Sequence, residues 1–290
     1  RIKYKKVQYG EHSQPEPEYP GEHWDLDSPE WDSFDEDAWG ELYDAWAATR
    51  PILLPEPGEF KPHEGWERGR VDLRRHFPGQ RLQVIVKMAN IELTPDSPEY
   101  EGGSWHIEGQ LNERIAASAI YYYDNENITP SNLSFRQRGG SDFYEPSYEQ
   151  SRHEFLEVVY GFDEPSKWGE RNITQELGGV KCEEGRLITF PNTLQHKVSP
   201  FSLADRSKPG HRKILALFLV DPHRRVISSA NVPPQREDWL PEGRREELKG
   251  KLMTLEEAKD SRLELMAERS LRSVERNRNY EVGDFNLCEH

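Results

Sequence analysis

The stretch LQVIVKMANIEL, residues 82–93, decides the fold: its β-branched and apolar residues are bounded by FPGQ before and by TPDSPE after. An apolar run between turn-forming residues predicts a β-strand. Three further segments of the same kind follow, namely RIAASAIYYY (114–123), RLITFPN (186–192) and KILALFLVDP (213–222). Gly- and Pro-rich breaks separate these strands, and no helices alternate with them. The pattern therefore predicts a mainly β fold, an antiparallel double-sheet barrel.

The composition changes on both sides of this strand-rich region. Residues 1–70 are rich in Pro, Glu, Asp and Trp, which predicts a polar arm that wraps the core, with one short helix at roughly 34–49. A second helix is predicted over 254–277, because Thr254 and Glu257 form a capping box at its start. The expected domains are an arm at 1–70, a barrel at 71–235 and a helical extension at 236–290.

The charge and the cysteine content limit the classes of function. The formal net charge is −15, from 38 basic and 53 acidic side chains, and a field of this sign opposes binding to nucleic acid. Only Cys182 and Cys288 are present, which excludes a disulfide framework and favours a reducing, cytoplasmic location. No run of 18 apolar residues occurs, so no membrane span is expected. The chain begins with Arg1, not Met, so we expect a preceding segment to be missing.

A pair of metal-ligand side chains stands in GGSWHIEG, residues 102–109. In an extended segment the side chains at i and i+2 lie on one face, so His106 and Glu108 are predicted to point together and Ile107 away from them. His196, in GRLITFPNTLQHKVSPF, is the predicted third ligand, since it stands at the edge of an apolar run. Two histidines and one carboxylate form a facial triad, which suits Fe(II) and leaves positions open for a cosubstrate and O₂.

An arginine follows this triad at the start of an apolar strand. Arg212 stands sixteen residues after His196, in GHRKILALFLVDP. If 2-oxoglutarate binds iron through its keto acid end, its far carboxylate needs a fixed cation, which the guanidinium of Arg212 would supply. The adjacent Lys213 is an alternative anchor that the residues leave open. Each residue also has an interpretation without a catalytic role. His196 could be a hydrogen-bonded loop histidine, and Arg212 could form a surface salt bridge at a strand edge.

Three long motifs carry a resemblance to a known family: GGSWHIEGQLNERIAASAIYYYDNENIT, LITFPNTLQHKVSPF and KPGHRKILALFLVDPHRRVISSANVPPQ. They closely resemble a large fungal family catalogued as domain of unknown function 4246. These motifs are similar to those of 2-oxoglutarate- and Fe(II)-dependent oxygenases, whose fold is a double-stranded β-helix of the jelly-roll, cupin-like type. The resemblance implies that His106, Glu108 and His196 are catalytic iron ligands and that Arg212 anchors 2-oxoglutarate. The oxygenases more often have Asp where this chain has Glu108.

The resemblance also implies a reaction. A dioxygenase of this kind uses Fe(II), 2-oxoglutarate and O₂ and removes hydrogen from a C–H bond of its substrate, while the protein binds, orients and excludes water. Tyr121 and Tyr123 share one face of their strand and Tyr122 lies on the other. Tyr121 and Tyr123 are the candidates to donate a phenol to the cosubstrate, and packing in the core is the alternative role of these rings. A small molecule is the expected substrate, rather than a polymer.

Two other functions stay open on the residues alone. One is a cupin-type metal enzyme that oxidises or hydrolyses a substrate bound directly to the metal, with the same three ligands and no use for Arg212. The other is a non-enzymatic jelly-roll interaction module that holds a partner through the acidic arm and the C-terminal helix. The identity of the substrate and the oligomeric state are not specified by the sequence.

Overall fold

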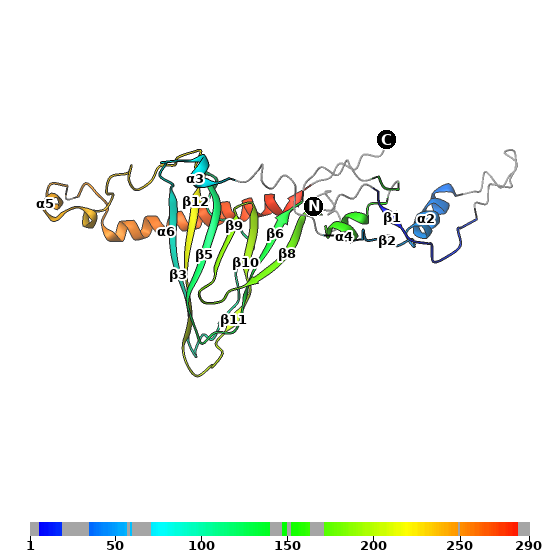
Figure 1. The fold of residues 1–290 in the computed structure, drawn as a ribbon, viewed down its shortest axis with the longest axis horizontal. Coiled ribbons are helices and arrows are strands. Elements are labelled where there is room, and N and C mark those ends of the chain that lie inside the picture. Colours follow the sequence, from blue (N-terminus) through cyan, green and yellow to red (C-terminus); the bar gives the residue numbers. More distant parts are fainter. Residues whose placement is uncertain are drawn as a thin grey trace. The chain divides into compact units, whose positions relative to one another are not determined.

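The computed structural model describes residues 6–18, 35–56, 59, 71–139, 147–149, 152–162, 171–248 and 250–283. The chain divides into two compact units (Figure 1). One unit comprises Arg1–His63, Gly139–Ile173 and Val282–His290, and the other comprises Glu64–Arg138 and Thr174–Glu281.

Within its described residues, the first unit has two short antiparallel strand pairs and two helices. Its elements are β1 (Gln8–Tyr9) paired with β2 (Ile52–Leu53), β7 (Arg171–Asn172) paired with β13 (Val282–Gly283), α2 (Glu36–Ala47) and α4 (Phe155–Tyr160). The helix predicted at 34–49 is present as α2, which begins after Asp35, whose carboxylate accepts a hydrogen bond from the Ala38 amide at 2.9 Å.

The first unit has a small core of its own, formed by Val7, Phe155, Leu156, Phe162 and Ile173. This core explains why the units differ from the predicted domains: residues near the N-terminus pack with residues of 139–173, which were assigned to the barrel. The C-terminal helix, assigned to a separate extension, belongs to the unit that contains the large sheet.

The second unit contains a four-stranded antiparallel sheet (Figure 1). Its strand order is β3 (Val84–Leu93), β12 (Gly210–Val220), β5 (Ile115–Glu126) and β9 (Leu187–Pro191). All four strands predicted from apolar content are therefore confirmed, and together they make this one sheet. β12 begins three residues before the predicted segment, so Arg212 lies within the strand and pairs with Ile91 and Asn125.

A three-stranded antiparallel sheet accompanies the larger one. Its order is β10 (Leu194–Val198), β6 (Asn132–Arg138) and β8 (Thr174–Lys181), and a separate pair joins β11 (Phe201–Ser202) to β4 (Glu99–Tyr100). Strands β6 and β8 were not predicted, because NLSFRQR and TQELGGVK contain no continuous apolar run.

One hydrophobic core joins the two sheets. Alternate side chains of each strand enter it, as strand geometry requires. Its buried members are Ile120, Tyr122, Leu133, Phe135, Cys182, Ile188, Phe190, Ala216 and Phe218. Because these residues come from both sheets, the sheets face each other in two layers. The prediction of a mainly β fold with antiparallel sheets is confirmed.

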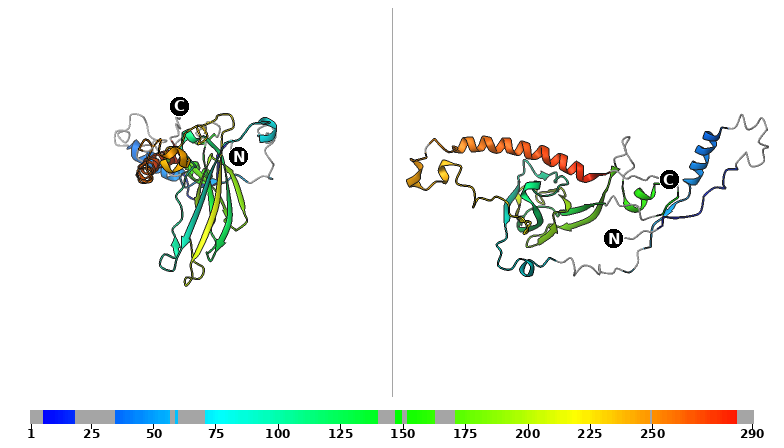
Figure 2. Two further views of the ribbon diagram at one scale, coloured as in Figure 1. Left: turned by 90° about the vertical axis from the view of Figure 1, so that its left-hand side faces the viewer. Right: turned by 90° about the horizontal axis from the view of Figure 1, so that it is seen from above.

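The second unit also carries helices outside the sheets: α3 (Leu73–His76), α5 (Glu242–Arg245), α6 (Leu255–Glu281) and the short 3₁₀ turns η2 (Leu111–Glu113) and η3 (Glu237–Trp239). The predicted capping box of α6 is confirmed, since the Glu257 amide donates to Thr254 Oγ1 at 3.2 Å and the Thr254 amide donates to Glu257 Oε2 at 2.8 Å. Figures 1 and 2 show α6 crossing the strands near one end of the sheets. Among the described residues, no helix combines the length and the apolar character of a membrane span.

Candidate metal centre

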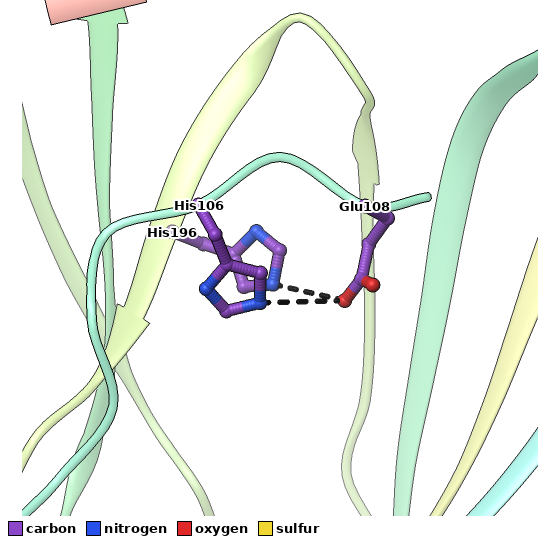
Figure 3. A group of neighbouring side chains, drawn as sticks. All are labelled: His106, Glu108 and His196. Atoms are coloured by element: carbon purple, nitrogen blue, oxygen red, sulfur yellow. Dashed lines mark hydrogen bonds and ion pairs between the residues drawn. The ribbon is translucent and has the colours of Figure 1, made fainter. Parts of the chain in front are cut away.

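Three side chains from two separate segments meet at the edge strand β10 of the smaller sheet: His106, Glu108 and His196 (Figure 3). Glu108 Oε1 lies 3.2 Å from His196 Nε2 and 3.7 Å from His106 Nε2. One ligand atom of each residue lies within 4.8 Å of the other two. The structure thus brings together the three side chains that the motifs predict as ligands, in a group that could hold a metal ion.

Backbone pairing aligns the two histidines. His106 belongs to no long strand, but it forms an isolated antiparallel bridge with His196 of β10. The His106 amide donates to the His196 carbonyl at 3.2 Å, and the His196 amide donates to the His106 carbonyl at 3.0 Å. Residues directly opposite in an antiparallel pair project to the same side, so the two rings face one space, with centroids 4.3 Å apart.

Two glycines let the ligand segment pass close to its neighbours. Gly102 has φ +93° and Gly109 has φ +68°, a region that side chains with a Cβ rarely adopt. A Cβ on Gly109 would lie 2.4 Å from Ile115 Cδ1, and one on Gly102 would lie 2.9 Å from the Val198 carbonyl oxygen. The glycines of the GGSWHIEG motif therefore have a steric role at the site.

Asn192 holds the backbone of Glu108. The Glu108 amide donates to Asn192 Oδ1 at 3.0 Å, and Asn192 Nδ2 donates to the carbonyls of Glu108 at 3.0 Å and Ile115 at 3.1 Å. Sequence reasoning missed this residue. The available signal was its place in the FPNT turn just before His196.

Hydrogen bonding leaves one ring nitrogen of His106 as the one that could bind a metal. Its Nδ1 lies 2.8 Å from the Ser104 carbonyl, which only accepts, so Nδ1 carries the proton. In the neutral ring the lone pair of Nε2 then faces Glu108 Oε1, and a cation between these two atoms removes their repulsion. His196 Nδ1 is buried and has no partner among the described residues, and its ring packs on Phe190 at 4.8 Å between centroids.

The charges of the three groups suit a divalent cation. Burial acts to raise the pKa of Glu108, but hydrogen bonds with His106 and His196 outweigh it and hold that pKa well below its usual range. Burial lowers the pKa of His196. Burial also acts to lower the pKa of His106, but its hydrogen bonds with Glu108 and Ser104 outweigh that effect and raise it. The His196 side chain is 3% exposed and that of His106 is 37% exposed, so the site is open on the His106 side.

Arg212 is a buried cation that no acidic residue in the described part of the chain neutralises. It is 2% exposed, and its Nε and Nη1 atoms have no hydrogen-bond partner among the residues that the structure describes. Burial lowers its pKa, but a guanidinium stays protonated. Its guanidinium carbon lies 4.1 Å from the centre of the Phe201 ring. It lines a cavity of about 260 Å³ together with Ser131, whose buried hydroxyl also has no partner there.

The neighbouring candidates point elsewhere. Lys213 lies on the other face of β12, where its Nζ binds Asp124 Oδ2 at 2.7 Å, so the arginine and not the lysine lines the cavity. The interior phenol is that of Tyr122, which is 1% exposed, whereas Tyr121 is 37% exposed. The prediction that Tyr121 and Tyr123 face the cosubstrate is therefore corrected: the strand alternates so that Tyr122 shares the interior face.

Tyr122 contacts both the cysteine and the arginine of the cavity. Its hydroxyl oxygen accepts a hydrogen bond from Cys182 Sγ at 3.2 Å, and its ring centre lies 5.7 Å from the Arg212 guanidinium carbon. Burial raises the pKa of this phenol, so it stays protonated at neutral pH. The other cysteine, Cys288, lies outside the described residues.

Comparisons with known proteins give one family. No curated protein is significantly similar to the chain. Among solved structures, the crystal structure of hydroquinone 1,2-dioxygenase PnpCD in complex with Cd²⁺ and 4-hydroxybenzonitrile aligns with a TM-score of 0.23 and 11% identity, over 59% of this chain and 83% of that chain. A similarity this low carries no argument. A family model described as "Protein of unknown function (DUF4246)" matches residues 2–243, and the chain therefore belongs to this family, as its motifs predicted.

Proposed function

We propose that this chain is an Fe(II)- and 2-oxoglutarate-dependent oxygenase that acts on a small molecule. The observation that carries the proposal is the convergence of two imidazoles and one carboxylate, whose ligand atoms lie within 4.8 Å of one another. Two histidines and one carboxylate are the ligand set of non-haem Fe(II) oxygenases. When bound, iron with 2-oxoglutarate and O₂ would supply the C–H oxidation chemistry.

The order of the strands supports a jelly-roll barrel as the frame of the site. In the larger sheet β3, the first strand of the second unit, adjoins β12, the last strand of that unit, and β5 and β9 complete the sheet. The other strands of this unit between β3 and β12 in the sequence form the three-stranded sheet β10-β6-β8 and the pair β11-β4. The chain therefore passes repeatedly from one layer to the other. This alternation of antiparallel strands between two facing layers is typical of a double-sheet jelly roll.

The three ligand side chains would have different parts in holding iron. His106 would bind through Nε2, since its Nδ1 is engaged with Ser104, and Glu108 would bind as the carboxylate that its lowered pKa maintains. His196, packed on Phe190, is the most enclosed of the three. The exposed side of His106 is the route by which small molecules would reach the metal.

The Arg212 cavity supports a carboxylate cosubstrate. A buried cation without a partner is costly, and an incoming carboxylate would remove that cost. The guanidinium has unpaired N–H groups at Nε and Nη1 among the described residues, and the unpaired hydroxyl of Ser131 is a further donor, so a carboxylate in this cavity would find hydrogen-bond donors. The Tyr122 hydroxyl accepts from Cys182, so its own proton would be available to a carboxylate that reached it.

A second inward cation is the competing anchor. Lys87 pairs with Ala216 across the sheet, and Ala216 belongs to the core, so Lys87 is on the interior side of β3. Its charge acts to lower the pKa of both His106 and His196. The test of the anchor must therefore separate Arg212 from Lys87.

Anaerobic titration tests the function. Iron-loaded protein should develop a metal-to-ligand charge-transfer band as 2-oxoglutarate is added, and in air it should release succinate. His196→Ala should abolish both signals. His223→Ala is the matched control and should leave them unchanged, because His223 is an exposed histidine that pairs with Asp221.

The outcomes separate the alternatives. Failure of the unaltered chain to bind iron would reject the proposal in favour of an interaction module. Iron binding without any response to 2-oxoglutarate would favour a cupin-type enzyme that binds its substrate directly at the metal. Loss of the 2-oxoglutarate response in Lys87→Ala, but not in Arg212→Ala, would move the anchor to Lys87.

A further inference from the structure

The last turns of α6 contact the segment that carries His106 and Glu108. Two N–H groups of Arg276 donate to the backbone carbonyls of Ile107, at 2.6 Å, and of Gly109. These carbonyls stand on either side of Glu108 in the sequence. Asn277 Nδ2 donates to the carbonyl of Trp105 at 3.0 Å, directly before His106. The helix therefore holds the backbone next to both ligands of this segment.

The same turns also contact the segment that carries the third ligand. Gln195, which precedes His196 and is fully buried, donates through Nε2 to Asn277 Oδ1 at 3.3 Å. The Tyr280 hydroxyl donates to the Thr193 carbonyl at 2.8 Å. Because the amide of Asn277 donates to Trp105 and accepts from Gln195, one side chain joins the two segments whose ligands must meet.

Polar contacts, and not burial of apolar area, attach α6 to the sheets. None of the described side chains of this 27-residue helix is buried. Its apolar residues Leu263, Met266, Leu271 and Val274 are all exposed. Arg269 adds an ion pair with Glu113 at 2.9 Å, five residues beyond Glu108. The helix thus contributes little to the core, and its polar contacts go to the ligand segments and to Arg136 and Arg138 of β6.

We propose that α6 is a clamp that fixes the spacing of the metal ligands, with Arg276 and Asn277 as positioning residues. The inference rests on the proposed metal site and goes beyond it, because it assigns a role to a helix that supplies no ligand. Pinning the carbonyls of Ile107 and Gly109 fixes the direction in which Glu108 leaves the backbone. Outer partners of this kind typically change metal affinity by about 10- to 100-fold when they are removed.

The positive charge of Arg276 and its hydrogen bonds have opposite effects on the affinity of the site for a metal cation. Burial lowers the pKa of Arg276, and the negative charge of nearby Glu108 acts to raise it. A nearby positive charge repels a metal cation, so removal of the charge alone would strengthen binding. The clamp makes the contrary prediction, since the loss of ligand positioning outweighs the relief of repulsion.

Binding of Co(II), followed through its visible absorption, tests the clamp without any need for activity. Arg276→Ala should weaken Co(II) binding by about 10-fold or more and should alter the Co(II) spectrum. Asn277→Ala should do the same without a change of charge. Arg276→Lys should retain part of the affinity, because one donor survives. Arg272→Ala is the matched control, one turn earlier on α6, where the arginine pairs with Glu268 on the surface.

Each result decides for or against the clamp. Absence of Co(II) binding by the unaltered chain would overturn the metal site and the clamp together. Normal binding that Arg276→Ala and Asn277→Ala leave unchanged, or strengthen, would overturn the clamp alone. If a melting curve shows that Arg276→Ala does not fold, the Co(II) affinity and the Co(II) spectrum of Asn277→Ala decide whether the clamp exists.

Discussion

Replacing Arg212 by methionine is expected to stabilise the ligand-free chain and at the same time to weaken 2-oxoglutarate binding. In the unaltered chain two buried N–H groups of the guanidinium lack a partner among the described residues, and each such group costs about 1–3 kcal/mol. The cation–π contact with the Phe201 ring offsets about 0.5–2 kcal/mol of this cost. Methionine fills similar space without a charge, so the free energy of unfolding should rise by about 1–4 kcal/mol, as when buried charges elsewhere are replaced by apolar residues.

Both effects can be measured on the same sample. A gain of that size corresponds to a rise in Tm of at least about 2 °C, since 1 kcal/mol shifts Tm by about 2–4 °C in a domain of this size. Loss of one partner of a buried charge pair costs about 2–5 kcal/mol, so the Kd for 2-oxoglutarate should rise by about 30-fold or more. Differential scanning calorimetry gives the first value, and anaerobic titration of the charge-transfer band gives the second.

Lys213→Met is the control, because Lys213 is next in sequence but pairs with Asp124 on the other face of the strand. It should change neither quantity appreciably. A fall in Tm for Arg212→Met would mean that the guanidinium has a structural partner. An unchanged Kd for 2-oxoglutarate would refute its role as the anchor, whatever the change in stability.

The remaining predictions concern the metal ligands and their neighbours. Alanine in place of any one of the three ligand residues should remove most bound iron while the melting curve stays cooperative; full occupancy by plasma spectrometry in all three variants would reject the triad. Asn192→Ala removes two hydrogen bonds to the Glu108 backbone and one to the Ile115 carbonyl and should weaken iron binding by about 10-fold, and an unchanged Kd would show that these bonds do not position Glu108. Tyr122→Phe should weaken 2-oxoglutarate by about 5-fold, for loss of one hydrogen bond of about 1 kcal/mol, whereas Tyr121→Phe should have no effect; equal effects would contradict the inward assignment of Tyr122.

The sequence by itself determined the parts of this protein that local patterns encode. The strands of the larger sheet were predictable because runs such as LQVIVKMANIEL are β-branched and apolar and are bounded by turn-forming residues, although Val86 and Met88 of β3 stay exposed. The common direction of His106 and Glu108 follows from the two-residue period of extended backbone, and the start of α6 follows from its capping box. In each case the interacting residues are within one turn or one strand of each other.

Only the tertiary structure decided which distant residues meet. Strands β6 and β8 are polar, so they become strands through their pairing and not through their composition. The alternation of RIAASAIYYY allowed either face to point inward, and the packing of Tyr122 against Cys182 and Arg212 made the choice. Arg276 reaches Ile107 across 169 positions of the sequence. No short-range pattern in the sequence predicts such a contact, because the two segments interact only after the sheets have brought them together.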